Sequence, residues 1–142
     1  MKKIKIFEEF VINSELKASV EKCINKKEPL LIKTTPGSGV IAMLQQILTG
    51  KNYNIVNCSY INSTDIDFQR RSQGKSLGQD IIVFDSIERA NPEVKKEIEN
   101  LLLSDKLNSY IIVSSGTNIN NQANQTFVHP FGGVKNVIIY KN

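Results

Sequence analysis

The chain has 142 residues, a formal net charge of +4, and 40% hydrophobic against 23% charged residues. This length fits one domain, and the balance is that of a folded globular chain rather than a disordered one. No apolar stretch approaches the length of a membrane span, and Lys5, Glu8 and Glu9 interrupt the N-terminal segment too often for a signal peptide. We therefore expect one cytoplasmic domain over residues 1–142, without membrane contact, which could be a fragment of a longer regulator.

Helical and strand-like patterns alternate along the chain. A first helix is predicted from residue 13 or 14 to about 25, because Leu16, Val20 and Ile24 lie on one helical face. In chain order we then expect a strand at 29–35, a helix at 39–49, strands at 53–59 and 80–85, a helix starting at Pro92 after an Asn91 cap, and strands at 110–115 and 135–142. The polar segments 60–80 and 116–133 are expected as loops, and a helix stays open as an alternative in each.

Strands separated by helices predict an α/β fold, with a five-stranded parallel sheet covered by helices on both faces. Ligand sites in such sheets lie at the carboxyl ends of the strands. We expect this edge to bring together the loop 36–39, Asp85 after the third strand, and Thr117 or Asn118 after the fourth.

The stretch "TTPGSGVIAM" has the outline of a phosphate-binding loop between a strand and a helix. Glycines let successive N–H groups face an anion, and the helix N-terminus adds its dipole. A phosphate loop also needs a lysine for the outer phosphates and a hydroxyl for Mg²⁺, where this chain has Val40 and Ile41. Alone, "PGSG" is equally a common turn. The candidate residues of this degenerate loop are Pro36, Gly37, Ser38, Gly39, Val40 and Ile41.

The run "IIVFDS" ends in an acid, as in a Walker B element, whose acid holds the magnesium shell. Asp85 is present, but Ser86 stands where a water-polarising glutamate belongs, and a serine is no general base without an activating partner. The alternative for Asp85 is a capping or surface carboxylate. Lys33 is expected to be a surface lysine at a strand end.

Taken together, these segments resemble the AAA+ ATPases, most closely the central domain of sigma-54-dependent transcription activators. The strand and loop "EPLLIKTTPGSG", the Val-Asn-Cys of "YNIVNCSYI", the Walker B region "IIVFDSIERANPEVKKEIENLLL", the sensor-like strand "IIVSSGTN" and the last strand "KNVIIYKN" follow the order of that family. The resemblance makes Asn118 the sensor-like residue. "ERANPEV" also resembles MoxR-type AAA+ proteins.

The departures from this family pattern cluster on the chemistry. Val40, Ile41 and Ser86 replace the lysine, the hydroxyl and the glutamate of the family. No arginine follows Arg89, so the arginine finger is missing, and the sigma-factor-binding loop is also absent. The resemblance therefore implies a non-catalytic pseudo-ATPase without catalytic or metal-binding residues, and not an enzyme. We expect no cofactor, or weak binding of ATP or ADP with a dissociation constant of about 1 mM or more. Its role would be a regulatory or protein-interaction module whose partner is an AAA+ protomer or the transcription machinery.

Two alternatives stay open. The chain could be a weak ATP-binding or ATPase domain that uses atypical residues such as Lys33, Ser38 and Asp85. It could also bind nucleic acid through the basic cluster Arg70, Arg71 and Lys75, although that segment has one nearby aromatic residue for base stacking.

Overall fold

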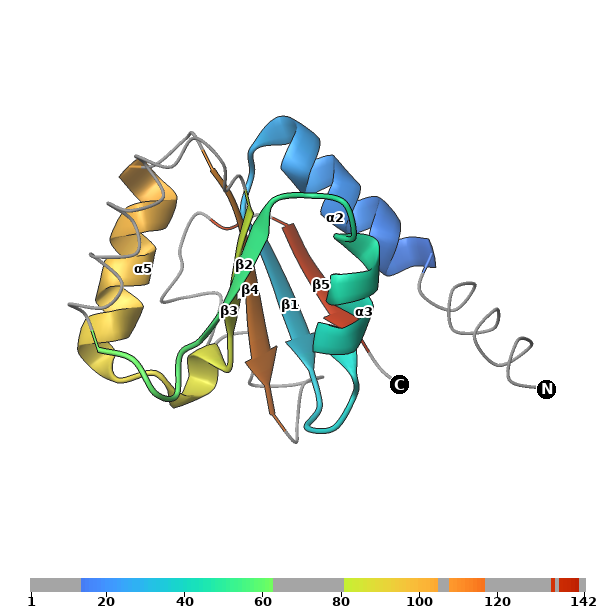
Figure 1. Ribbon diagram of the computed structural model, residues 1–142. Helices are drawn as coiled ribbons and strands as arrows, with labels where there is room; N and C mark the ends of the chain where they lie inside the picture. The colour runs from blue at the N-terminus through green and yellow to red at the C-terminus, as the bar shows by residue number, and fades with distance from the viewer. Residues whose placement is uncertain (1–13, 63–80, 105–107, 117–133, 135, 141–142) are drawn as a thin grey trace.

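The computed structural model describes residues 14–62, 81–104, 108–116, 134 and 136–140 (Figure 1). The predicted elements that fall in these ranges are confirmed, with ends that differ by up to about two residues. The segments 63–80 and 117–133, predicted as loops, lie outside the described residues. The elements are α2 (Ser14–Lys26), β1 (Leu30–Thr34), α3 (Val40–Ile47), β2 (Tyr53–Asn57), β3 (Ile81–Asp85), the 3-10 helix η1 (Ile87–Arg89), α5 (Pro92–Ser104), β4 (Ser109–Ser115) and β5 (Asn136–Tyr140).

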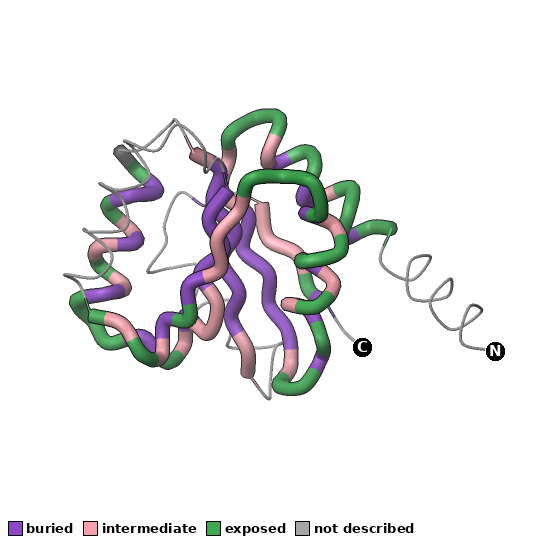
Figure 2. The backbone as a smooth tube through the Cα atoms, in the orientation of Figure 1, coloured by how far each residue is buried: buried purple, intermediate pink, exposed green. Residues whose placement is uncertain are grey.

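The five strands form one parallel sheet in the order β2-β3-β4-β1-β5. Strand β1, an interior strand, pairs with β4 on one side and β5 on the other, with Lys33 opposite both Ser114 and Ile139. Because its neighbours and the flanking helices cover it on every side, all five residues of β1 are buried, as Figure 2 shows. The predicted parallel sheet is confirmed.

Two hydrophobic cores lie on opposite faces of the sheet. In Figure 1, α5 covers one face and α2 and α3 cover the other. Since side chains alternate along a strand, Leu31 belongs to the α5-side core, whereas Leu30 and Ile32 belong to the α3-side core. The predicted buried stripe of α5 is confirmed and consists of Val94, Ile98, Leu101 and Leu102.

Local chemistry sets where the helices begin and end. The Asn91 side chain accepts a hydrogen bond from the Val94 N–H at 2.9 Å, which confirms the predicted cap of α5. Gly50 follows α3 with a φ of 84°, as expected of a helix terminator. On α2, Cys23 is buried and Ile24 only partly so, because the helical face turns slightly away from a strict four-residue repeat.

Among the described helices, none is long and apolar enough to cross a membrane.

Candidate functional site

The phosphate-loop candidate is a turn built on two glycines. Gly37 has a φ of 78° and Gly39 a φ of 79°, values that residues with a Cβ adopt only at a cost. Gly39 is the N-cap of α3 and supplies no side-chain cap. The turn therefore leads directly into α3, and no side chain of the N-cap residue caps the first N–H groups of the helix.

The N–H groups of this turn are only partly used inside the protein. The Met43 N–H donates to the Gly39 carbonyl at 3.1 Å, so the N–H groups of Ile41 and Ala42 precede the helical ladder. The Val40 N–H donates to Ser38 Oγ at a long 3.3 Å. Such an open helix N-terminus with adjacent backbone donors is suited to an anion.

Val40 and Ile41 do not protrude into the mouth of the loop. The Val40 side chain is 4% exposed and belongs to the α3-side core, and Ile41 packs against the same core. The two hydrocarbon side chains thus serve packing. They leave the backbone donors uncovered but add no cation to them.

Asp85 ends β3 at the same edge of the sheet. Its carboxylate accepts hydrogen bonds from the backbone N–H and the hydroxyl of Ser86, which lower its pKa, but burial, the largest effect, and the nearby Glu88 carboxylate raise the pKa above its ordinary value. Ser86 has a φ of 59°, an uncommon conformation for a residue other than glycine. A strained turn next to a desolvated acid is typical of a functional site.

Glu88 is the site residue that the sequence analysis missed. Its Oε1 accepts a hydrogen bond from the Ser115 N–H at 2.9 Å, and its Oε2 lies 3.8 Å from Arg89 Nε. The side chain is 18% exposed, against 74% for Arg89, so the carboxylate is held over the edge of the sheet. The signal was an acid two residues after Ser86, outside the position at which the Walker B pattern has its glutamate.

Backbone contacts connect these pieces. The Gly116 N–H donates to the Thr34 carbonyl at 2.9 Å, which joins the end of β4 to the start of the loop. Only β4 separates β1 from β3, so two strand spacings place their ends roughly 10 Å apart. The loop 36–39 and Asp85 thus follow parallel strands that end at the same edge of the sheet, and their meeting in one site stays a prediction. Thr117 and Asn118 lie outside the described residues.

Lys33 is not the surface lysine that we expected. It is 1% exposed, and by alternation its side chain belongs to the α5-side face, away from α3. Burial lowers the pKa of its ammonium group. Lys33 lies opposite Ser114 in the register, and Ser114 Oγ has no hydrogen-bond partner within the described part of the chain. The expectation failed because covering elements, which no local pattern reveals, bury this strand end.

The residues of this edge fit the phosphate end of a nucleotide in part. The open N–H groups before Met43 suit phosphate oxygens, and the carboxylates of Asp85 and Glu88 are the oxygen ligands that Mg²⁺ prefers. No described group of three His, Cys, Asp or Glu residues could hold a metal ion unaided. A magnesium ion here would therefore depend on phosphate oxygens for part of its shell.

Comparison with known proteins bears on the fold. No protein-family profile matches the chain, and no curated protein sequence matches it. Among solved structures it is similar to the Thermotoga maritima RuvB Holliday junction branch migration motor, with a TM-score of 0.63 at 14% identity over 92% of this chain and 44% of that one. A Thermotoga maritima protein related to the DNA polymerase III gamma subunit gives 0.61 at 9% identity, over 87% of this chain and 45% of that one.

A chain in the structure of Drosophila ORC bound to AT-rich DNA and Cdc6 gives a TM-score of 0.56 at 12% identity, over 94% of this chain and 57% of that one. The chain thus spans about half the length of these neighbours. They are AAA+ P-loop ATPases, and the chain has their α/β fold. The predicted fold class is confirmed.

The prediction that the chain is not an enzyme is contradicted by these neighbours, which are AAA+ ATPases and include a branch migration motor. That prediction inferred the absence of catalytic groups from the residues at the expected motif positions. The structure holds a further carboxylate, that of Glu88, at this edge of the sheet through the Ser115 N–H, and the motif positions did not reveal it.

Proposed function

We propose that the chain is an AAA+-type nucleotide-binding module that binds ATP or ADP at the carboxyl edge of its sheet and hydrolyses ATP slowly with Asp85 and Glu88. The observation that carries this proposal is the placement of the glycine turn before α3 and the two carboxylates at one edge of the sheet. The fold it shares with AAA+ ATPases supports the same assignment.

The turn would hold the phosphates through its backbone. The N–H groups of Gly39, Ile41 and Ala42 would donate to phosphate oxygens, and the dipole of α3 would add to the attraction. Because Val40 supplies no cation, we expect weak affinity, with a dissociation constant of about 1 mM.

The two carboxylates would divide the remaining work. Asp85, held by Ser86, would ligate the magnesium ion, which when bound neutralises phosphate charge. Glu88 is anchored through one oxygen by Ser115, and its other oxygen would accept a proton from water. Without an arginine finger, turnover should resemble the intrinsic rate of a P-loop protein, on the order of 10⁻³ s⁻¹ or slower.

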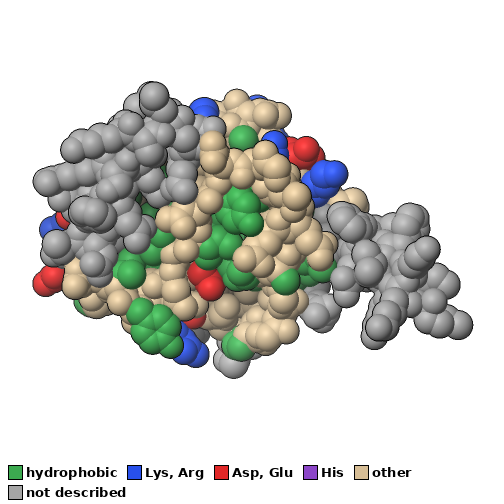
Figure 3. All heavy atoms as spheres, viewed as in Figure 1, with side chains coloured by type: hydrophobic (Ala, Val, Ile, Leu, Met, Phe, Trp, Pro, Cys, Tyr) green, Lys and Arg blue, Asp and Glu red, His purple; other side chains and the backbone are tan. Residues whose placement is uncertain are grey.

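The finer assignments rest on the sequence pattern. The Val-Asn-Cys of β2 and the region around Asp85 support a module of the sigma-54-activator type that acts on a protein partner in transcription regulation. Binding of nucleic acid through Arg70, Arg71 and Lys75 is the second candidate, but these residues lie outside the described part of the chain. On the face drawn in Figure 3, the described charged side chains are scattered and form no continuous basic band.

Calorimetric titration with ATP and magnesium, together with a coupled assay of phosphate release, tests the proposed function. We expect saturable heat for the wild type and phosphate release that Asp85→Asn abolishes while the protein stays folded. A folded wild-type protein that gives no heat with millimolar ATP would contradict nucleotide binding. If the wild type bound ATP but released phosphate no faster than Asp85→Asn, the proposed hydrolysis would be contradicted and the proposed nucleotide binding would stand.

A further inference from the structure

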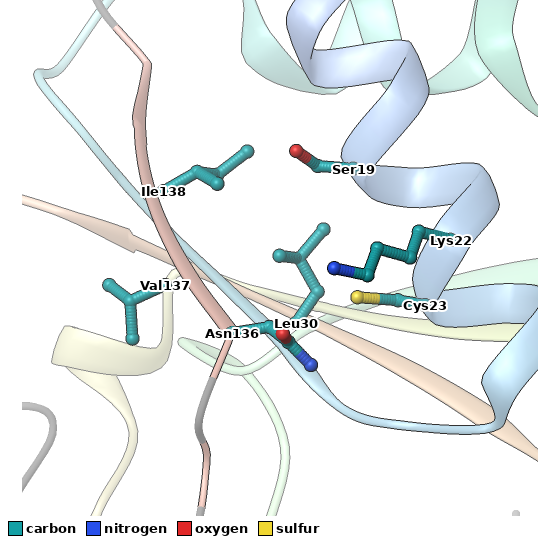
Figure 4. A pocket seen from close by; sticks show the side chains of 7 residues that line it. All are labelled: Ser19, Lys22, Cys23, Leu30, Asn136, Val137 and Ile138. Atoms are coloured by element: carbon teal, nitrogen blue, oxygen red, sulfur yellow. The ribbon is translucent and has the colours of Figure 1, made fainter.

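A cavity lies at the opposite end of the sheet from the phosphate loop. Leu30 and Asn136 are the first residues of β1 and β5, so the cavity opens at the amino ends of these strands, between β5 and α2 (Figure 4). Its volume is about 200 Å³. The lining residues are Ser19, Lys22, Cys23, Leu30, Asn136, Val137 and Ile138.

The strand beside this cavity, β5, lies at one end of the described sheet. β5 is last in the strand order and, among the described strands, pairs with β1 alone. Its sequence, "NVIIY", has no charge and is rich in β-branched residues, and Ile139 is 45% exposed. An uncharged edge of this kind presents backbone N–H and C=O groups that can pair with another strand.

The walls of the cavity combine an apolar floor with a cationic rim. Leu30 and Cys23 are buried, and Ile138 lines the side nearest β5. Figure 4 shows the Lys22 ammonium group directed over the space between α2 and β5. The side chain of Asn136 stands at the far rim and donates to the Pro29 carbonyl at 3.5 Å.

The charged side chain in the lining of the cavity is a cation, Lys22. Lys22 and Lys26, one helical turn apart, both act on the Cys23 thiol, and Glu28 acts on it with the opposite sign. Because Lys22 is the charged residue that lines the cavity, an acidic occupant is favoured. A volume of about 200 Å³ is smaller than a typical small-molecule site and suits a single apolar side chain.

We propose that the free edge of β5 and this cavity form a docking site for an extended acidic peptide segment of a partner protein. The segment adds a strand to β5, places one apolar side chain in the cavity, and sets a carboxylate against Lys22. Backbone pairing gives the affinity, and the cavity gives the specificity. A second copy of the chain is a poor occupant, because its own β5, "NVIIY", carries no acidic side chain to set against Lys22.

The probe is a fluorescein-labelled seven-residue peptide with blocked ends, Val-Thr-Glu-Thr-Val-Thr-Glu, which is long enough for one strand and carries its valines and glutamates on the same face. Fluorescence anisotropy without nucleotide should show saturable binding. Lys22→Glu should weaken it about tenfold or more, because the change reverses the charge that faces the carboxylate. Lys17→Glu is the matched control: Lys17 is exposed on the same helix, does not line the cavity, and should leave binding within about twofold.

A second peptide tests the strand pairing. Methylation of alternate backbone nitrogens removes donors on one edge, so the methylated probe should lose binding although its charge is unchanged. Equal loss from Lys22→Glu and Lys17→Glu, or undiminished binding of the methylated probe, would show attraction by charge alone and overturn the proposal. A concentration-dependent dimer by sedimentation, with no peptide binding, would assign the edge to a second copy and overturn it too.

Discussion

The backbone N–H of Ser115 donates to Glu88 Oε1 at 2.9 Å, across 27 residues of sequence. The bond ties the end of β4 to the 3-10 turn that follows β3. Because β4 lies between β3 and β1, this hydrogen bond holds the Glu88 carboxylate at the end of the strand between Asp85 and the phosphate loop. Asp85 feels this charge, since Glu88 contributes to the rise in the pKa of its carboxyl. The proposed function uses these two acids together, although Ser86 interrupts the expected motif.

Glu88→Gln should remove hydrolysis and keep nucleotide binding. The glutamine oxygen can still accept from the Ser115 N–H, so the turn is preserved, but the group that would take a proton from water is lost. We expect the rate of phosphate release to fall by about 10² or more, the range of general-base contributions, with the ATP affinity unchanged within about twofold. Single-turnover phosphate release and calorimetry measure the two quantities separately.

Glu93→Gln provides the control for this prediction. Glu93 is an exposed acid in the first turn of α5, so its loss changes the net charge equally but leaves the site intact. Phosphate release should match the wild type. If Glu88→Gln kept the wild-type rate, Glu88 would serve only to anchor the turn.

Asp85→Asn should stabilise the fold at neutral pH. Burial raises the pKa of this carboxyl, so between its ordinary value and the raised one the native state holds a proton that the unfolded chain has lost. Stability therefore falls as the pH rises through that window, and the penalty persists above it. Asparagine carries no charge and removes the penalty. The same variant should lose magnesium-dependent nucleotide binding, which is the usual conflict between stability and function.

Thermal unfolding by circular dichroism at acid and neutral pH tests this sign. The midpoint of Asp85→Asn should exceed that of the wild type at neutral pH, and the two should converge near pH 3, where the wild-type carboxyl is protonated in both states. A wild-type midpoint above that of the variant at neutral pH would mean that the Ser86 hydrogen bonds outweigh the burial of the charge.

The elements that the sequence predicted are those fixed by local chemistry. The apolar run of β3 and the Asn91 cap carry their reasons within a few residues, so their placement followed directly. Glu88 and Lys33 were misjudged because their surroundings come from distant segments. Ser115 supplies the partner of Glu88, and the strands and core on either side of β1 bury Lys33. Burial at the end of a strand depends on the whole fold, which a motif does not encode.

Gly39→Ala should damage both the loop and its ligand binding. No atom lies within 4 Å of a Cβ added at Gly39, so the cost comes from the φ of 79° and not from a clash. A left-handed conformation costs an L-residue about 1–2 kcal/mol. The variant should therefore unfold at a lower temperature, or its turn should change conformation so that the N–H groups before Met43 point elsewhere. We expect ATP affinity to fall about tenfold or more.

Gly116→Ala is the matched control for the loop. It also has open space around an added Cβ and lies at the same edge, but its φ is outside the left-handed region. Its stability and its ATP affinity should stay close to those of the wild type. Equal effects of the two substitutions would locate the sensitivity in the edge as a whole and not in the glycine turn.

The thiols of Cys23 and Cys58 should be unreactive toward thiol reagents in the native protein. Burial, aided by the Asp85 and Glu88 carboxylates, raises the pKa of Cys58 to about 12, so only about 10⁻⁴ of it is thiolate near pH 8. Cys23 is also buried with a raised pKa. A thiol reagent such as DTNB should label neither within minutes under native conditions and both in strong denaturant. Fast labelling that Cys58→Ser removes would show that the strand end above Asp85 opens to solvent.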